Sequence, residues 1–382
     1  MKPLHLLFLT GSRGEWGYIR PILRLCEKRA DISYSLVVTN MHLLPSYGMS
    51  VNEIEADGFT VGHRIYAALD GCNHVTMVKS LGVLLASLAD IIASQRPDWI
   101  VLAGDRGEQL MGAVLGAFCY IPVAHIQAGE LSGNIDGMTR HAIGKYAHLH
   151  LAANEDAANR LEKLGEERHR IHNVGAPQLD ELVQAKISSL TDVETRLGLE
   201  LKRDFILVVQ HPVTEEISEA EQQIGVTMEA LARFSEAKIV VLPNNDAGST
   251  LTRQGIERNR RGEFYCFANL KREDYLSLMK HCVCMVGNSS SGLLEAPTLK
   301  TAAVNLGRRQ AGRVRGINVI DAPFEVEAIV EAITRARSPS FRANIHSDGI
   351  NPYGDGHSAE RILELLEVTR VTSDLLVKTL TY

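Results

Sequence analysis

The sequence of 382 residues is poor in several features that mark large classes of protein. It has only six cysteines, and of these only Cys282 and Cys284 stand close together. Two residues apart on a strand, their side chains point to opposite faces, and no second cysteine or histidine pair has zinc-ligand spacing. We therefore expect reduced thiols, no metal, and a cytoplasmic location.

A long apolar run and an excess of positive charge are also missing. The run Leu4–Leu9 is short and breaks at Thr10 without a small-residue cleavage site, so it indicates a buried strand rather than a signal peptide. No segment is expected to be long and apolar enough to span a membrane. The formal net charge of −6 argues against nucleic acid or anionic lipid as a partner. An anionic ligand would need a local basic pocket.

Two nucleotide-binding fingerprints are absent as well. The sequence has no G-x-x-x-x-G-K-[ST] loop and no G-x-G-x-x-G after a predicted strand. A phosphate site in this protein would therefore be neither an ATPase P-loop nor a conventional dinucleotide site.

What the sequence does have is a regular alternation of strand-like apolar runs and helical patterns. Hydrophobic residues make up 45% and charged residues 23%, which is typical of a globular protein. The alternation predicts an α/β fold of parallel sheets covered by helices. The predicted strands are 4–9, 34–39, 99–103, 123–126, 149–152, 171–174, 205–210, 238–242, 283–286 and 302–306, and the predicted helices are 18–28, 78–95, 109–118, 178–199 and 358–376.

The length suits two Rossmann-like domains with a central cleft. We expect residues 1–180 to form the first domain and residues 181–365 the second, with residues 366–382 returning to the first. Ligands of open parallel sheets bind outside the carboxyl ends of the strands. Each polar motif described below directly follows a predicted strand, which predicts one shared site.

The stretch Val286–Pro297 is the most informative. Ser289 and Ser290 offer hydroxyl and N–H groups at a predicted helix N-terminus, where the helix dipole favours a diphosphate. Gly292 lets the backbone approach a ligand closely, and Glu295 could accept hydrogen bonds from ribose hydroxyls. A serine-rich N-cap without any ligand is the alternative.

Further polar residues follow other strands of the second domain. His211 could donate to a phosphate or a sugar hydroxyl, although a single histidine at a strand end is more often structural. Asn244 belongs to an Asn-Asn-Asp cluster that could equally be ordinary turn chemistry. Arg308, Arg309 and Arg313 could form the basic patch that an anionic ligand requires, or a solvated surface.

Carboxylates, histidines and arginines gather at neighbouring strand ends of the first domain. Such clusters can set carboxylate pKa values apart for acid and base work, although a salt-bridged loop network is the alternative. Arg13, in the first strand-to-helix turn, could reach the phosphates or this cluster, and His42 follows the second strand. Besides His211, the catalytic candidates are Asp105, Gln127, Glu130 and Asp136, and the further substrate-binding candidates are His42, Arg106 and Arg140.

These motifs resemble the UDP-N-acetylglucosamine 2-epimerase family, specifically its hydrolysing branch in sialic- and legionaminic-acid biosynthesis. The similarity runs from Thr10 to about Leu365. The most diagnostic motifs are H-I-x-x-G-E-x-S-G-x-I-D-x-x-x-R-H at His125–His141 and the Gly287–Pro297 block. The Gly-Asp-Arg turn at 104–106, Gln210–Thr214 and Asn351–Gly356 add to them.

The resemblance implies a glycosyltransferase-B-like pair of Rossmann-type domains, a UDP-sugar substrate, no cofactor, and a homodimer or homotetramer. It also implies anti elimination of UDP to a 2-acetamidoglycal, followed by hydration that inverts carbon 2. It assigns catalysis to Asp105 and Asp136, nucleotide-sugar contact to Arg13 and His211, phosphate binding to Ser289 and Ser290, and ribose binding to Glu295.

One departure from the family pattern concerns the chemistry. The family block usually reads His-Ile-Glu, but the third position here is Gln127, which cannot take a proton. Either Asp105, Asp136 or Glu130 covers the acid–base work, or the steps are divided differently. The change could accompany another sugar, such as that of UDP-N,N'-diacetylbacillosamine. In the first turn, Gly14-Glu15-Trp16 replaces the common Ala-Asp-Phe/Tyr.

Three alternative functions stay open. A non-hydrolysing 2-epimerase would return a UDP-linked product. A retaining glycosyltransferase of the same architecture would need an acceptor and leave C2–H unexchanged. A catalytically dead nucleotide-sugar sensor, to which Gln127 points, would bind UDP and turn nothing over.

Overall fold

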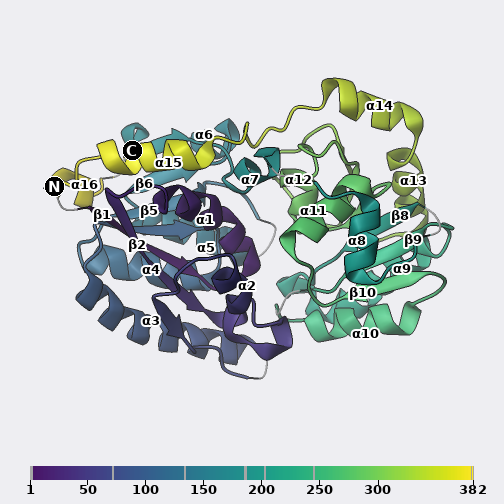
Figure 1. Cartoon of the computed structure of the whole chain (residues 1–382), viewed down its shortest axis with the longest axis horizontal. Coiled ribbons are helices and arrows are strands. Elements are labelled where there is room, and N and C mark those ends of the chain that lie inside the picture. Colours follow the sequence, from purple (N-terminus) through teal and green to yellow (C-terminus); the bar gives the residue numbers. More distant parts are fainter. Residues whose placement is uncertain are drawn as a thin grey trace. The chain divides into compact units, whose positions relative to one another are not determined.

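The computed structural model describes residues 3–70, 73–132, 135–184, 187–201, 204–243, 246–379 and 381. The chain divides into two compact α/β units. Unit 1 is made of Met1–Leu131, Ile135–Val183 and Tyr353–Tyr382, and Gln184–Pro352 form the body of unit 2 (Figure 1). Residues 353–365, which we expected in the second domain, therefore belong to unit 1.

The described part of unit 1 contains a seven-stranded parallel sheet in the order β3-β2-β1-β4-β5-β6-β7. The strand order reverses between β1 and β4, so the carboxyl ends of these strands form the switch point where such sheets bind ligands. The strands are β1 (Leu4–Thr10), β2 (Ile32–Thr39), β3 (His63–Ile65), β4 (Trp99–Ala103), β5 (Val123–Ala128), β6 (Leu149–Ala152) and β7 (Ile171–Asn173).

Helices cover both faces of this sheet (Figure 1). On one face Phe8 belongs to a core with Ile19 of α1 and Ile362 of α15. On the other face Leu9 packs in a core with Leu88 of α3 and residues of α4 and α5. The helices are α1 (Arg13–Cys26), α2 (Val51–Ala56), α3 (His74–Gln95), α4 (Gly107–Phe118), α5 (Ile135–Tyr146), α6 (Glu155–Lys163), α7 (Gln178–Gln184), α15 (Ser358–Val368) and α16 (Ser373–Leu376).

Helix α1 begins at Arg13, earlier than the predicted start at Tyr18. The reason is a capping box in which Ser12 accepts from the Glu15 N–H and the Glu15 carboxylate accepts from the Ser12 N–H. Reciprocal capping satisfies two N–H groups that would otherwise lack partners, so the helix starts directly after β1. The turn that carries Arg13 is thereby fixed.

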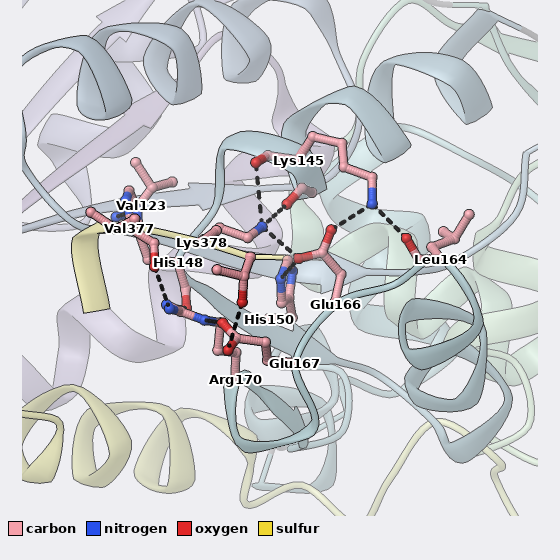
Figure 2. Close-up of polar contacts among 12 residues, drawn as sticks. Val123, Lys145, His148, His150, Leu164, Glu166, Glu167, Arg170, Val377 and Lys378 are labelled. Atoms are coloured by element: carbon pink, nitrogen blue, oxygen red, sulfur yellow. Dashed lines mark hydrogen bonds and ion pairs between the residues drawn. The ribbon is translucent and has the colours of Figure 1, made fainter. Parts of the chain in front are cut away.

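The C-terminal segment completes unit 1 as two helices, not the single predicted one over 358–376. Asp180 caps α15 by accepting from the N–H groups of Ser358 at 3.0 Å and Ala359 at 2.5 Å. Figure 2 shows how the residues beyond α16 are held: Arg170 donates to the Val377 carbonyl at 3.2 Å, and Lys378 pairs with Glu166 at 2.5 Å. Buried charges thus fasten the end of the chain to β6 and β7.

The described part of unit 2 is built on a six-stranded parallel sheet, β10-β9-β8-β11-β12-β13, whose order reverses between β8 and β11. Its core gathers Val208, Val240 and Val286 of the central strands with residues of α9, α10 and α13. The strands are β8 (Phe205–Val209), β9 (Ala237–Val241), β10 (Phe264–Phe267), β11 (Met285–Gly287), β12 (Ala303–Leu306) and β13 (Val319–Ala322), and the helices are α8 (Leu190–Leu197), α9 (Ala220–Leu231), α10 (Ser249–Asn259), α11 (Arg272–His281), α12 (Ser291–Leu294), α13 (Val326–Ala336) and α14 (Pro339–Asp348).

The prediction of one continuous helix over 178–199 is wrong. The structure has α7 and α8 in its place, and α8 begins anew where the Ser189 hydroxyl accepts from the Asp192 N–H at 3.2 Å. A serine cap of this kind offers the backbone an alternative to continuing one helix.

Helix α3 corrects the expectation that no segment could span a membrane. Among the described helices it is the one with the length and composition of a membrane span, with a mean hydropathy of 1.8. Leu84, Leu88 and Ile92 pack onto the sheet, whereas Val75 is 63% exposed and Val78 is 69% exposed. Length and composition do not separate a membrane span from a sheet-packed helix with an apolar outer face.

Candidate functional site

The carboxyl end of β4 presents Asp105, the first predicted acid. Its side chain is 20% exposed and forms an ion pair with Arg140, whose side chain is only 4% exposed. Arg140 also donates to the backbone oxygen of Gln127 at 2.6 Å. We expected Arg140 to contact substrate, but its burial and partners make it the residue that ties Asp105 to the end of β5. Asp136 is half-buried and lies one helical turn before Arg140 on α5.

His125 also holds the turn that carries Asp105. His125 is fully buried, and its Nε2 donates to the Gly104 carbonyl at 2.7 Å. Burial lowers the pKa of His125 to about 3, so the ring is neutral near pH 7. Gly104 has a φ of +88°, a conformation that favours glycine, and it directly precedes Asp105. His125 stands in a predicted motif, but the sequence alone did not assign it this role.

The other two predicted catalytic residues of this motif, Gln127 in β5 and Glu130 just after it, are enclosed. Gln127 is 1% exposed and has a φ of +63°, at a register irregularity between Ile126 and Ala128. Left-handed backbone at a non-glycine residue costs on the order of 1–3 kcal/mol and often marks functional sites. Glu130 is 2% exposed and accepts from the Asn154 amide at 2.5 Å. Asp105 and Asp136 are therefore the predicted acids whose side chains are accessible.

His42 is not accessible to a ligand, contrary to expectation. It is fully buried, with Nε2 bonded to the Thr10 hydroxyl at 3.0 Å and Nδ1 to the Ser50 hydroxyl at 2.8 Å. Burial lowers its pKa to about 3. His42 braces the turns after β1 and β2 through these two bonds.

Arginines and buried carboxyl groups line the switch point between β1 and β4. Arg13 is half-buried and donates to the Tyr47 carbonyl at 3.2 Å, and Arg106 lies 3.5 Å from Glu108. Glu15 accepts from the Gly11 N–H at 2.6 Å. Burial, and then the neighbouring Glu108 carboxylate, raise the pKa of Glu15 to about 8. We noted Glu15 only as a departure from the family and did not expect this buried pair.

In unit 2, hydrogen bonds join the loops after β8 and β11 at the switch point. The His211 N–H donates to the Asn288 side-chain oxygen at 2.7 Å, and the Asn288 amide donates to the His211 carbonyl at 2.8 Å. Gly287 has a φ of +138°, and a Cβ there would lie 2.1 Å from the Val209 oxygen. These two reciprocal hydrogen bonds fix the half-buried His211 beside Ser289–Ser291, which we call the serine turn. Asn288 was missed because its role depends on a residue far along the chain.

The serine turn differs from the expected helix N-terminus. Ser289 and Ser290 are half-buried, but α12 is a single turn of four residues, so little macrodipole develops there. The case for a phosphate therefore rests on hydroxyl and N–H groups. A Cβ at Gly292 would lie 3.2 Å from the Ala303 Cβ, so the missing side chain at this position serves close packing within unit 2.

The three arginines of the predicted patch contact protein groups of unit 2, and one of them reaches the turn after β11. Arg308 forms an ion pair with Glu216, and Arg309 donates to the Asn288 carbonyl at 3.3 Å. Arg313 is 7% exposed and donates to Gln310 at 3.1 Å. The Arg309 bond joins the loop after β12 to the turn after β11. The Arg308 pair joins that loop to the segment after β8, and the Arg313 bond lies within the loop. Asn244, the remaining predicted contact, lies outside the described residues.

Two parallel α/β sheets, each with polar turns at its switch point, are typical of the glycosyltransferase-B-like class of two-domain proteins, and the predicted pair of Rossmann-like domains is confirmed. Within this class the chain belongs to the UDP-N-acetylglucosamine 2-epimerase family, whose model matches residues 24–367.

Individual relatives agree with this assignment. The chain is 35% identical to the UDP-N,N'-diacetylbacillosamine 2-epimerase (hydrolyzing) of Legionella pneumophila, over 98% of both chains. It is 33% identical to a UDP-N-acetylglucosamine 2-epimerase of Neisseria meningitidis serogroup B, over 94% of both. In fold it is similar to the crystal structure of the UDP-GlcNAc 2-epimerase of Neisseria meningitidis bound to UDP-GlcNAc. That likeness has a TM-score of 0.82 and 18% identity, over 96% of this chain and 100% of the other.

Proposed function

We propose that the protein is a hydrolysing 2-epimerase that releases UDP and the 2-epimeric free sugar from a UDP-2-acetamido sugar. The observation that carries the proposal is the acid turn of unit 1: Asp105 is accessible, Arg140 of α5 pairs with it, and His125 holds the residue before it. A rigidly held carboxylate is what proton transfer at carbon requires.

The chemistry divides between the two units. Unit 2 binds the nucleotide, with Ser289 and Ser290 at the diphosphate and Glu295 at the ribose. In unit 1 a carboxylate, Asp105 or Asp136, removes the C2 proton while the C1–O bond breaks and UDP leaves with the electron pair. A proton then adds to C2 from the opposite face, and water adds at C1 and loses its own proton. Donors around the leaving diphosphate stabilise the charge that develops on it.

The substrate is UDP-N,N'-diacetylbacillosamine or UDP-N-acetylglucosamine, and the product enters nonulosonic acid synthesis of the legionaminic or sialic type. The Legionella relative is named for the first substrate and the Neisseria relative for the second. Gln127 in place of the usual glutamate favours the first. We place the enzyme in the cytoplasm, since the cysteines of the described segments, including Cys26 and Cys284, carry free thiols.

Turnover of both substrates in heavy water tests this function. We expect free UDP and a manno-configured sugar that carries deuterium at C2, because the carboxyl group that reprotonates C2 exchanges with solvent. The better substrate identifies the substituent at C4. No UDP release from either substrate would reject the proposal.

The same experiment separates the alternatives. A non-hydrolysing epimerase would place deuterium at C2 but leave the product linked to UDP. A retaining glycosyltransferase would leave C2–H intact and require an acceptor. A nucleotide-sugar sensor would bind UDP without any turnover.

We also propose a homo-oligomer, a homodimer or homotetramer, that forms through α3. The outer face of this helix exposes Val75, Val78 and Val83. Large exposed apolar patches mark interaction surfaces, and two copies of one stripe can cover each other about a two-fold axis.

Replacing Val78 with glutamate is expected to convert the oligomer into monomers, because the interface would bury an unpaired charge. Light scattering coupled to gel filtration measures the mass. Val368→Glu is the matched control, since Val368 on α15 is 69% exposed, as Val78 is, but lies outside the stripe. A wild-type protein that is monomeric and binds liposomes would assign α3 to a membrane instead.

A further inference from the structure

Helix α11 (Arg272–His281) meets the serine turn through two polar residues one helical turn apart. The Tyr275 hydroxyl lies 2.5 Å from the Ser291 hydroxyl, and the Arg272 guanidinium donates to Glu295 at 2.9 Å. Neither Tyr275 nor Arg272 belongs to a motif found in the sequence. Both lie within unit 2, behind residues that the proposed function assigns to the nucleotide.

Three hydroxyl groups form a continuous chain in this region. Ser289 Oγ lies 2.9 Å from Ser291 Oγ, which in turn is bonded to Tyr275. Ser289 Oγ also accepts from the Ser291 N–H at 3.4 Å. Ser291 is 6% exposed, so water does not readily replace a missing member of the chain.

When Ser289 binds an anion, the donors and acceptors in this row of three hydroxyl groups are fixed. A hydroxyl donates one hydrogen bond, so Ser289 can donate to a phosphate oxygen only if its bond with Ser291 is one that it accepts. Ser291 then donates to Ser289 and must accept from Tyr275. A buried phenol at the far end supplies that donor, and each bond in such a chain polarises the next.

The contact between Arg272 and Glu295 concerns the ribose of the nucleotide, which the proposed function assigns to Glu295. The Glu295 side chain is 10% exposed, so it has few orientations without a fixed partner. An ionised carboxylate has about four acceptor positions, and one arginine contact leaves room for ribose hydroxyls.

We propose that Tyr275 and Arg272 are positioning residues for the nucleotide: Tyr275 directs the Ser289 O–H at the diphosphate, and Arg272 directs the Glu295 carboxylate at the ribose. The proposal rests on the proposed function, in which unit 2 binds UDP. Each acts through the side chain that it holds, so Tyr275 bears on the diphosphate and Arg272 on the ribose.

Calorimetric binding of UDP and of uridine separates the two roles. Tyr275→Phe is expected to weaken UDP about three- to tenfold and to leave uridine unchanged, because uridine has no phosphate. Arg272→Gln is expected to weaken both ligands by one common factor of about ten, since both contain the ribose. Arg272→Lys, which keeps the charge, should recover part of that loss.

Tyr265→Phe is the matched control, because Tyr265 is another tyrosine of unit 2 whose hydroxyl donates to a carboxylate, Glu263, at 2.9 Å. It should leave both affinities unchanged. Equal weakening of UDP and uridine by Tyr275→Phe, or no effect on either, would overturn the inference, while UDP binding by the wild-type protein would leave the nucleotide site of the proposed function standing. A wild-type protein that binds no UDP would overturn both.

Discussion

Asp105→Asn is expected to lower the rate of UDP release by about 100-fold or more and to leave UDP affinity largely intact. General acid–base catalysis contributes roughly 10²–10⁴ in rate, and an amide cannot take a proton. Asparagine keeps the size of the side chain and an oxygen that can accept from Arg140. UDP release is followed by a coupled assay, and UDP binding by calorimetry. We expect the same result from Asp136→Asn.

Asp98→Asn is the matched control for Asp105→Asn. Asp98 is also half-buried and lies at the opposite end of β4, where it accepts from the His5 N–H at 2.8 Å. Its loss should leave turnover near that of the wild type. Loss of UDP affinity in Asp105→Asn or Asp136→Asn would argue that these acids are structural and not catalytic.

A stability measurement must accompany this comparison. Arg140 is nearly buried and would lose its charged partner in Asp105→Asn, and an uncompensated buried charge is costly. We therefore expect a lower thermal midpoint for Asp105→Asn, and turnover should be compared well below it. A fall in turnover without a fall in UDP affinity at that temperature is not explained by unfolding.

The central strands were predictable from the sequence, because strands buried on both faces read as continuous apolar runs. β4 and β6 have the predicted bounds, 99–103 and 149–152. The edge strands β3, β10 and β13 were missed. β3 is only His63–Ile65, with a half-buried histidine and an exposed arginine, and its pairing with β2 is visible only in the folded sheet.

For the candidate site, the turns were predictable but the directions of their side chains were not. Strand ends and small residues located Asp105 and Ser289, since sheet geometry brings such turns to one edge. Whether the Arg140 side chain contacts a ligand or pairs with Asp105 depends on how α5 packs against the sheet. The local sequence does not determine that packing. Tyr275 gave no signal because it lies mid-helix, and the left-handed backbone of Gln127 follows from the register of β5 against β6.

Unit 1 is expected to lose stability steeply below about pH 6.5, which is the pKa of an unfolded histidine. Among the described residues, four histidines are buried: His42, His125, His148 and His150. Burial lowers the pKa to about 3 for His42 and His125 and to about 4 for His148 and His150. Figure 2 shows His148 and His150 in the network that holds the C-terminal segment.

The sign follows from which state binds protons. The folded pKa values lie below the unfolded one, so the stability that the neutral histidines contribute is present above about pH 6.5 and is lost as pH falls toward the folded values. At pH 5 each group that charges only on unfolding costs about 2 kcal/mol. Burial alone would raise the pKa of Glu166, but hydrogen bonds from His150 and Lys378 outweigh it and lower that pKa, which adds loss of stability at still lower pH.

Glu15 acts in the opposite direction. Its folded pKa, raised to about 8 by burial and by Glu108, lies above the unfolded value. The stability that Glu15 contributes is therefore fully present below its unfolded pKa of about 4.5 and is lost as pH rises through its folded pKa of about 8. With the histidines, this places the stability maximum of unit 1 between about pH 6.5 and 8.

Tryptophan fluorescence reports on unit 1 alone, because the two tryptophans of the chain, Trp16 and Trp99, both lie there and are buried. Urea unfolding followed by this signal should give a free energy that falls between pH 6.5 and 5 with a slope of about three to four protons near pH 5. His150→Asn should lower the slope by about one proton, whatever it does to stability at pH 7. His169→Gln, at an exposed position, should leave the slope unchanged. A wild-type slope below one proton would mean that these histidines are charged in the folded protein.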